Sequence, residues 1–179
     1  MWLLTKPSWR LAWPTLVVML ASTLLSCGFE LRGQNDRANT LGRYPIAVIS
    51  QAPSSEFTAE LRDELKRQGA TLDPVADAAL VIYVDVENFE QRSLSLTARA
   101  RAAEIELQAS VNFSVKLRGE WLIDNESIAV VDQMLNDPLN VVGKTEEMRL
   151  LQEELRTALV EALSRRLAYG IAAYHARQA

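Results

Sequence analysis

The chain is poor in the residues that build most catalytic and metal sites. It has one cysteine and one histidine in 179 residues. A lone cysteine excludes an internal disulfide, and together the two residues cannot supply the ligands of a structural zinc site. His175 lies near the C-terminus, where we expect a solvated side chain rather than the base of a Ser-His-Asp triad. These shortages make a hydrolase a distant hypothesis.

Glycine is also scarce, and the chain is acidic. The seven glycines form no loop that could cradle phosphate, and 23 acidic residues face 19 basic ones, a net charge of −4. An acidic protein does not bind nucleic acid nonspecifically, so an anionic partner would have to meet a local group of cations. Glu104 and Glu106 could act as an acid–base pair, but we expect them on a solvated strand face. The composition favours a non-enzymatic protein that works through anchoring and surface contacts.

Residues 1–26 have the pattern of an export signal. Lys6 and Arg10 precede an apolar stretch over residues 11–25. At about 1.5 Å per residue this stretch reaches only ~22 Å, short of the ~30 Å core of a membrane. No charged residue follows at once, which is typical of a signal peptide rather than a membrane span. The stretch ends in Leu24-Leu25-Ser26-Cys27, which resembles the lipobox of bacterial lipoproteins.

Cys27 is the predicted lipid attachment site. Lipidation explains a lone cysteine in an exported chain; the alternative is a protein cut elsewhere, with Cys27 an incidental buried thiol. Gly28 follows the cysteine, and by the sorting rules of enterobacteria glycine there permits transfer to the outer membrane. We expect a protein anchored on the periplasmic side of the outer membrane, with diacylglycerol and an N-acyl chain such as palmitate on Cys27 and no other cofactor.

The rest of the chain is long enough for one domain. Removing 26 residues from 179 leaves 153, and removing Lys6 and Arg10 from the 19 bases leaves 17 against 23 acids, or −6. The polar residues 27–43 are predicted to form a lipidated tether. We place a single domain at 44–169 and a flexible tail at 170–179.

Periodicity predicts the elements of this domain. Residues 105–118 alternate strictly between apolar and polar side chains, which indicates a strand with one buried face. Ser54 or Ser55 can cap a helix that ends at Arg67, before Gly69, and Thr145 can cap a helix that ends at Leu167 or Tyr169. Further strands are predicted at 44–50, 80–96 and about 125–135.

The predicted order is strand, helix, three strands, helix. Each helix has one apolar stripe and the sheet has one apolar face, so the simplest packing places both helices on that face. The predicted fold is an α+β two-layer sandwich with a four-stranded, mostly antiparallel or mixed sheet. The other face of the sheet is polar, and it could meet water or a partner.

Three cations are candidates for binding an anionic lipid. Arg99 and Arg101 lie in the turn between the two longest strands, beside Leu94 and Leu96. Guanidinium groups next to aliphatic side chains suit a ligand with phosphates and acyl chains; the alternative is a solvated hairpin tip. Lys144 lies at a helix N-terminus, where the helix dipole disfavours a cation, so it is either a screened loop residue or an anion ligand.

The sequence Cys27-Gly28-Phe29-Glu30-Leu31-Arg32-Gly33 resembles the start of mature lipoproteins of the LptE family. The Ala103-Glu104 approach to the alternating strand, the Asn136-Asp137-Pro138 break and the closing helix are also similar. Glu30 departs from the family, which often has histidine there.

The resemblance implies a function. LptE-like proteins are outer-membrane lipoproteins, not enzymes, with two helices on a four-stranded sheet. They form a one-to-one complex with the LptD β-barrel, plug and help to assemble it, and bind lipopolysaccharide during its insertion into the outer leaflet. Arg99, Arg101 and Lys144 are then the candidates for binding lipopolysaccharide phosphates. Two alternatives stay open: a stand-alone lipid carrier, which needs a closed apolar cavity, and a pilot lipoprotein for a different outer-membrane pore.

Overall fold

The computed structural model describes residues 40–96, 102–135 and 141–178, all of them in the compact unit Asn35–Ala179. The other unit, Met1–Gln34, lies outside the described residues. The elements, in chain order, are β1 (Pro45–Ser50), α3 (Glu56–Arg67), β2 (Thr71–Leu72), β3 (Leu80–Val84), β4 (Asn88–Leu96), β5 (Ala102–Leu117), β6 (Glu120–Leu135) and α4 (Val141–Gln178).

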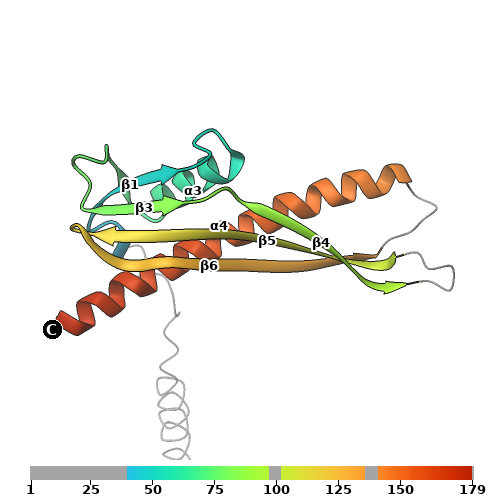
Figure 1. The fold of residues 1–179 in the computed structure, drawn as a ribbon. Coiled ribbons are helices and arrows are strands. Elements are labelled where there is room, and N and C mark those ends of the chain that lie inside the picture. The colour runs from blue at the N-terminus through green and yellow to red at the C-terminus, as the bar shows by residue number, and fades with distance from the viewer. Residues whose placement is uncertain (1–39, 97–101, 136–140, 179) are drawn as a thin grey trace, which may run out of the picture. The chain divides into compact units, whose positions relative to one another are not determined.

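The strand β5 lies at the centre of a mixed sheet (Figure 1). Along one edge it pairs antiparallel with β6 over nearly its whole length. Along the other edge it pairs antiparallel with β3 near its C-terminal end and with β4 near its N-terminal end. The strands β1 and β2 extend the sheet beyond β3 through parallel pairs.

The alternation of residues 105–118 is confirmed as a strand with one buried face. Every second side chain of β5, from Ile105 to Leu117, is almost fully buried, and the side chains between them are at least partly exposed. Burial of one face fixes the register, because a slip of one residue would bring Glu106 or Lys116 into the core.

The helix α3 begins and ends as its sequence predicts. The Ser55 side chain accepts a hydrogen bond from the backbone N–H of Thr58 at 3.2 Å, so Ser55 rather than Ser54 is the N-cap. The helix ends at Arg67, and Gly69 follows with a φ of 84°, a backbone conformation that glycine adopts without strain.

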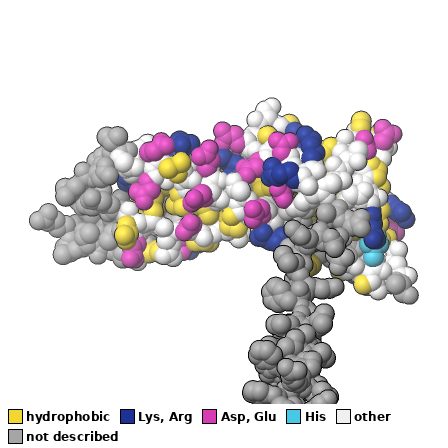
Figure 2. Space-filling model, turned by 180° about the vertical axis from the view of Figure 1, so that it is seen from behind, with side chains coloured by type: hydrophobic (Ala, Val, Ile, Leu, Met, Phe, Trp, Pro, Cys, Tyr) yellow, Lys and Arg dark blue, Asp and Glu magenta, His cyan; other side chains and the backbone are white. Residues whose placement is uncertain are grey.

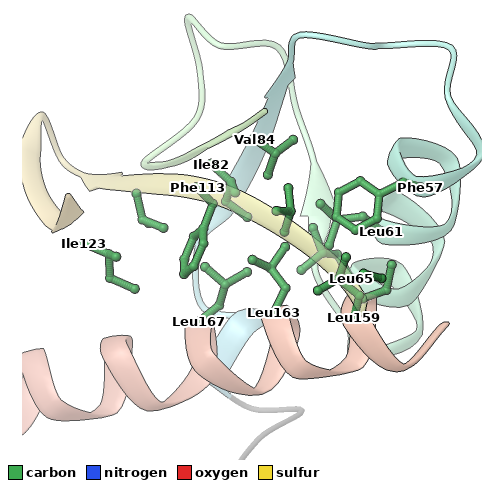
Figure 3. Close-up of a cluster of buried hydrophobic side chains, with 14 of the residues drawn as sticks. Phe57, Leu61, Leu65, Ile82, Val84, Phe113, Ile123, Leu159, Leu163 and Leu167 are labelled. Atoms are coloured by element: carbon green, nitrogen blue, oxygen red, sulfur yellow. The ribbon is translucent and has the colours of Figure 1, made fainter. Parts of the chain in front are cut away.

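Both helices pack on the apolar face of the sheet, so the predicted fold class is confirmed (Figure 3). Side chains from α3, among them Phe57 and Leu61, meet Leu159 and Leu163 of α4 and Ile82 of β3 in one continuous core. The polar face of the sheet carries no helix among the described residues.

The number of strands differs from the prediction. The predicted strand over residues 80–96 is two strands, because the three residues 85–87 lie opposite only residues 111 and 112 of β5, between the pairs Val84–Phe113 and Asn88–Ser110. The short β2 was not predicted. β6 begins at Glu120 rather than near residue 125, because Arg118 and Gly119, with φ of 52° and 87°, close a two-residue hairpin.

The helix α4 is longer than predicted at both ends. It begins at Val141, before the predicted cap at Thr145, and it continues to Gln178. The flexible tail predicted after residue 169 is wrong for residues 170–178. Ile171 is fully buried, and Tyr174 packs against the core, so apolar burial continues the helix past Gly170.

Candidate functional surfaces

Of the four predicted site residues, only Lys144 is among the residues that the structure describes. Cys27, Arg99 and Arg101 lie outside the described residues, so their predicted roles stay predictions. Lys144 is described. It lies in the first turn of α4, half-buried, and forms no ion pair with another described residue.

The segments that carry these cations leave the same end of the sheet. Glu104 of β5 pairs with Ser95 of β4 on one side and with Leu135 of β6 on the other. The segment with Arg99 and Arg101 connects β4 to β5, and residues 136–140 connect β6 to α4. The topology therefore brings both ends of the first segment and the β6 end of the second together.

The polar face of the sheet near this end mixes charge with aliphatic side chains. Arg92 of β4 reaches across to β5, with Nε 3.5 Å from Glu106 Oε1 and a guanidinium N–H donating to Gln108 Oε1 at 3.0 Å. Val131 and Leu135 of β6 are exposed on the same face. Sequence analysis did not predict this exposure, although alternation along β6 places both side chains on the face of the sheet that points away from the core.

A buried ion cluster joins the sheet to α4. Arg156 donates from Nε to both carboxylate oxygens of Glu87 at 3.1 Å, and its Nη1 lies 2.7 Å from Glu56 Oε2. Burial raises the pKa of Glu87 above its ordinary value, and the Arg156 charge partly offsets that rise. Only 13% of the Glu87 side chain and 14% of the Arg156 side chain are exposed, so this cluster is a structural clamp.

Acidic and basic side chains are mixed on the two helices, and glutamates gather in one place. An open groove between α3 and α4 is lined by four glutamates: Glu60, Glu153, Glu154 and Glu161. The face seen in Figure 2 carries many acidic side chains among basic ones. Within the described residues, no group of His, Cys, Asp and Glu could hold a metal ion, and no helix is long and apolar enough to cross a membrane.

The only histidine is not a solvated tail residue, contrary to expectation. His175 Nε2 lies 2.6 Å from the Tyr44 hydroxyl, and the two rings stack with centroids 5.9 Å apart. This contact ties the C-terminal turns of α4 to the residue that precedes β1. Sequence analysis missed it because no local pattern links two residues 131 positions apart.

Aromatic and basic residues also meet around the β5–β6 turn. Lys116 Nζ lies 4.2 Å from the Trp121 ring centroid, and Arg118 Cζ lies 5.8 Å from that of Tyr44. A two-residue hairpin at 118–119 places residues 116 and 121 opposite each other. This juxtaposition could therefore have been predicted from a turn at Gly119 if the following strand had been placed directly after it, at Glu120.

Comparisons with known proteins agree on the family. The family model described as "LptE: Lipopolysaccharide-assembly" matches residues 45–167, more than two thirds of the chain. The LPS-assembly lipoprotein LptE of Yersinia enterocolitica is 23% identical over 143 residues, which is 79% of this chain and 68% of that protein.

Solved structures share the fold. Rare lipoprotein B from Shewanella oneidensis is 25% identical with a TM-score of 0.67, covering 73% of this chain and 98% of that one. Lipoprotein B from Nitrosomonas europaea is 19% identical with a TM-score of 0.63, covering 79% and 90%. With the family match spanning the domain from β1 into α4, the chain belongs to the LptE family of lipopolysaccharide-assembly proteins.

Proposed function

We propose that this protein is an outer-membrane lipoprotein that plugs an LptD-like β-barrel, helps to assemble it, and binds lipopolysaccharide during its insertion into the outer leaflet. The family match over the folded domain carries the proposal. By this proposal Cys27 bears the lipid, the domain faces the periplasmic side, and one copy joins one barrel.

The surface of the domain suits a plug. A barrel wide enough to pass lipopolysaccharide has a polar lumen and would leak unless it were filled. A plug must therefore bury its apolar side chains internally and present polar ones to the wall. Here α3 and α4 cover the apolar face of the sheet, and the open face carries Arg92, Glu104 and Glu106.

A stand-alone lipid carrier has less support. A carrier needs a closed apolar cavity for an acyl chain. The groove between α3 and α4 is open and is lined by glutamates, which repel acyl chains and phosphates alike.

The lipopolysaccharide contact is proposed at the sheet end where β4, β5, β6 and α4 meet. Arg99 and Arg101 come from one connecting segment, and Lys144 follows the other. We expect R99E/R101E to weaken binding of purified lipopolysaccharide at least tenfold, since charge-assisted contacts to phosphate become repulsive. The control is R62E/R165E, which makes the same charge change at a partly exposed position on α3 and an exposed one on α4. Equal affinity of the two variants would remove Arg99 and Arg101 from the site.

Depletion in the native bacterium tests the biological role. Loss of the protein should reduce both folded barrel and surface lipopolysaccharide, and wild-type protein should restore them. C27A should fail to restore them because the domain loses its anchor. Normal surface lipopolysaccharide in depleted cells would refute the proposed function.

A further inference from the structure

The β5–β6 turn carries a group of cations held against aromatic rings. Lys116 Nζ lies 4.2 Å from the Trp121 ring centroid and 5.8 Å from that of Tyr83, while Arg118 lies over Tyr44. Tyr83 and Trp121 also contact each other, with centroids 5.8 Å apart. We call these residues the basic aromatic corner: Tyr44, Tyr83, Lys116, Arg118 and Trp121.

The corner is partly exposed, and its two cations contact aromatic rings but no carboxylate among the described residues. Trp121 is 52% exposed and Arg118 is also exposed. Neither Lys116 nor Arg118 forms an ion pair within the described part of the chain. Most of the other described bases do: Lys66, Arg67, Arg92, Arg149, Arg156, Arg165 and Arg166. Glu120 is adjacent to Trp121 in sequence, but strand alternation directs the two side chains to opposite faces. The two cations are therefore available to an external anion.

Arg118 occupies a position that its side chain does not favour. Its φ is 52°, in the left-handed region where hairpin turns prefer asparagine or glycine. Arg118 therefore adopts this backbone conformation at some energetic cost. Such strained residues often lie at functional contacts.

The corner lies where the chain enters the domain. Leu41 is fully buried and Tyr44 belongs to the corner, so the entering segment is fixed there. Twelve residues, 28–39, separate Cys27 from the first described residue, Thr40, and the chain between the two can span at most about 45 Å. A lipid on Cys27 would therefore tether the domain through the chain that enters at this corner. Figure 2 shows dark-blue basic side chains beside the cyan histidine, the residue that stacks on Tyr44.

We propose that the basic aromatic corner docks on anionic phospholipid headgroups of the periplasm-facing leaflet and so orients the domain on its anchor. The inference rests on the proposed lipidation of Cys27. Trp and Tyr place an apolar ring and a polar tip at the headgroup level, and Lys and Arg meet the phosphates there. The corner supplies all four side-chain types around the β5–β6 turn, and its charge complements an anionic leaflet.

Trp121 reports on this contact directly. The other tryptophans, Trp2, Trp9 and Trp13, lie in the predicted signal peptide, so the lipidated chain that begins at Cys27 carries Trp121 alone. Purified from membranes, it is reconstituted in phosphatidylethanolamine–phosphatidylglycerol vesicles that contain a nitroxide-headgroup lipid. The control adds W121F and L150W, because Leu150 is 47% exposed and lies on α4 about 37 Å from His175, the α4 residue that contacts Tyr44. Docking predicts quenching of Trp121 several-fold stronger than that of the control tryptophan.

The charge reversal K116E/R118E separates docking from anchoring. It should lower the quenching of Trp121 to the control level while the protein still floats with the vesicles through its lipid. Wild-type quenching no stronger than the control, in protein that floats, would overturn the corner contact and leave the anchor intact. If Trp121 is quenched only when the barrel is reconstituted with the protein, the corner contacts the barrel and the proposed contact with phospholipid is wrong. Protein that fails to float would overturn both the anchor and the docking.

Discussion

At the residue scale, the clamp between Glu87 and Arg156 shows how burial decides the value of a charge. The two side chains are mostly buried and pair through both carboxylate oxygens. Burial nevertheless raises the pKa of Glu87, so desolvation outweighs the attraction of Arg156. The charged carboxylate is tolerated only because the guanidinium is present.

Removing either partner should therefore have unequal effects. R156A leaves a buried carboxylate without its main cation, and we expect a loss of about 1–3 kcal/mol in the free energy of unfolding near pH 7. E87Q removes the buried charge and should cost less than about 1 kcal/mol, since Arg156 keeps Glu56. Urea denaturation of both variants measures the difference. Equal losses would contradict the account.

The pH dependence of R156A follows from the sign of the shift. A raised folded pKa means that the folded state holds the Glu87 proton more tightly than the unfolded state. The contribution of Glu87 to the free energy of unfolding therefore falls as pH rises from 4.5, the ordinary pKa of a glutamate, through the folded pKa. Without Arg156 the folded pKa should rise further. The loss of stability in R156A should consequently shrink between about pH 7 and pH 5, and a loss that is constant with pH would count against this mechanism.

Sequence alone identified residues whose role is local. Ser55 was recognisable as a cap because its partner, Thr58, is three residues away. The Glu87–Arg156 and Tyr44–His175 pairs join residues 69 and 131 positions apart, and no sequence period connects them. The roles of Cys27, Arg99 and Arg101 still rest on sequence and resemblance.

At the element scale, the sequence predicted strands and helices with a strong hydrophobic period, but it did not predict where such a pattern is interrupted or extended. The strand β5 followed from alternation because one face is entirely buried. The break between β3 and β4 was missed because alternation continues through residues 80–86, and only one extra residue opposite β5, within residues 85–87, separates the two strands. The extension of α4 to Gln178 depends on tertiary burial of Ile171.

The cap of α3 gives a test with a built-in control. S55A removes the acceptor for the Thr58 N–H and should lower the free energy of unfolding by about 1 kcal/mol. The matched change S54A alters an exposed serine beside it and should have almost no effect. Thermal denaturation of the two variants compares them, and equal stabilities would mean that Ser55 is not the cap.

The C-terminal turns of α4 should contribute to stability. I171A removes a fully buried side chain, and we expect a cost of about 2–4 kcal/mol from lost burial and the cavity left behind. A172S changes the exposed neighbour and serves as the control. If I171A were as stable as A172S in urea denaturation, residues 170–178 would form the flexible tail that the sequence suggested.

At the scale of the whole molecule, the fold presents one covered and one open face of a mixed sheet. The class of fold followed from the order of elements and from two helices that each need one apolar surface covered. The strand order did not, because β3 and β4 share one edge of β5 and no sequence pattern reports which strands pair. A plug would meet the barrel wall through the open face of the sheet. It would meet the membrane through the basic aromatic corner, and lipopolysaccharide at the sheet end that carries residues 97–101.

The most direct test of the central claim is purification of the C-terminally tagged protein from its own outer membranes in mild detergent, followed by mass spectrometry. The account predicts a near one-to-one complex with an LptD-like barrel that carries lipopolysaccharide, and a mass for the lipoprotein that begins at an acylated Cys27. Recovery of the protein alone, or with an unrelated pore, would contradict it.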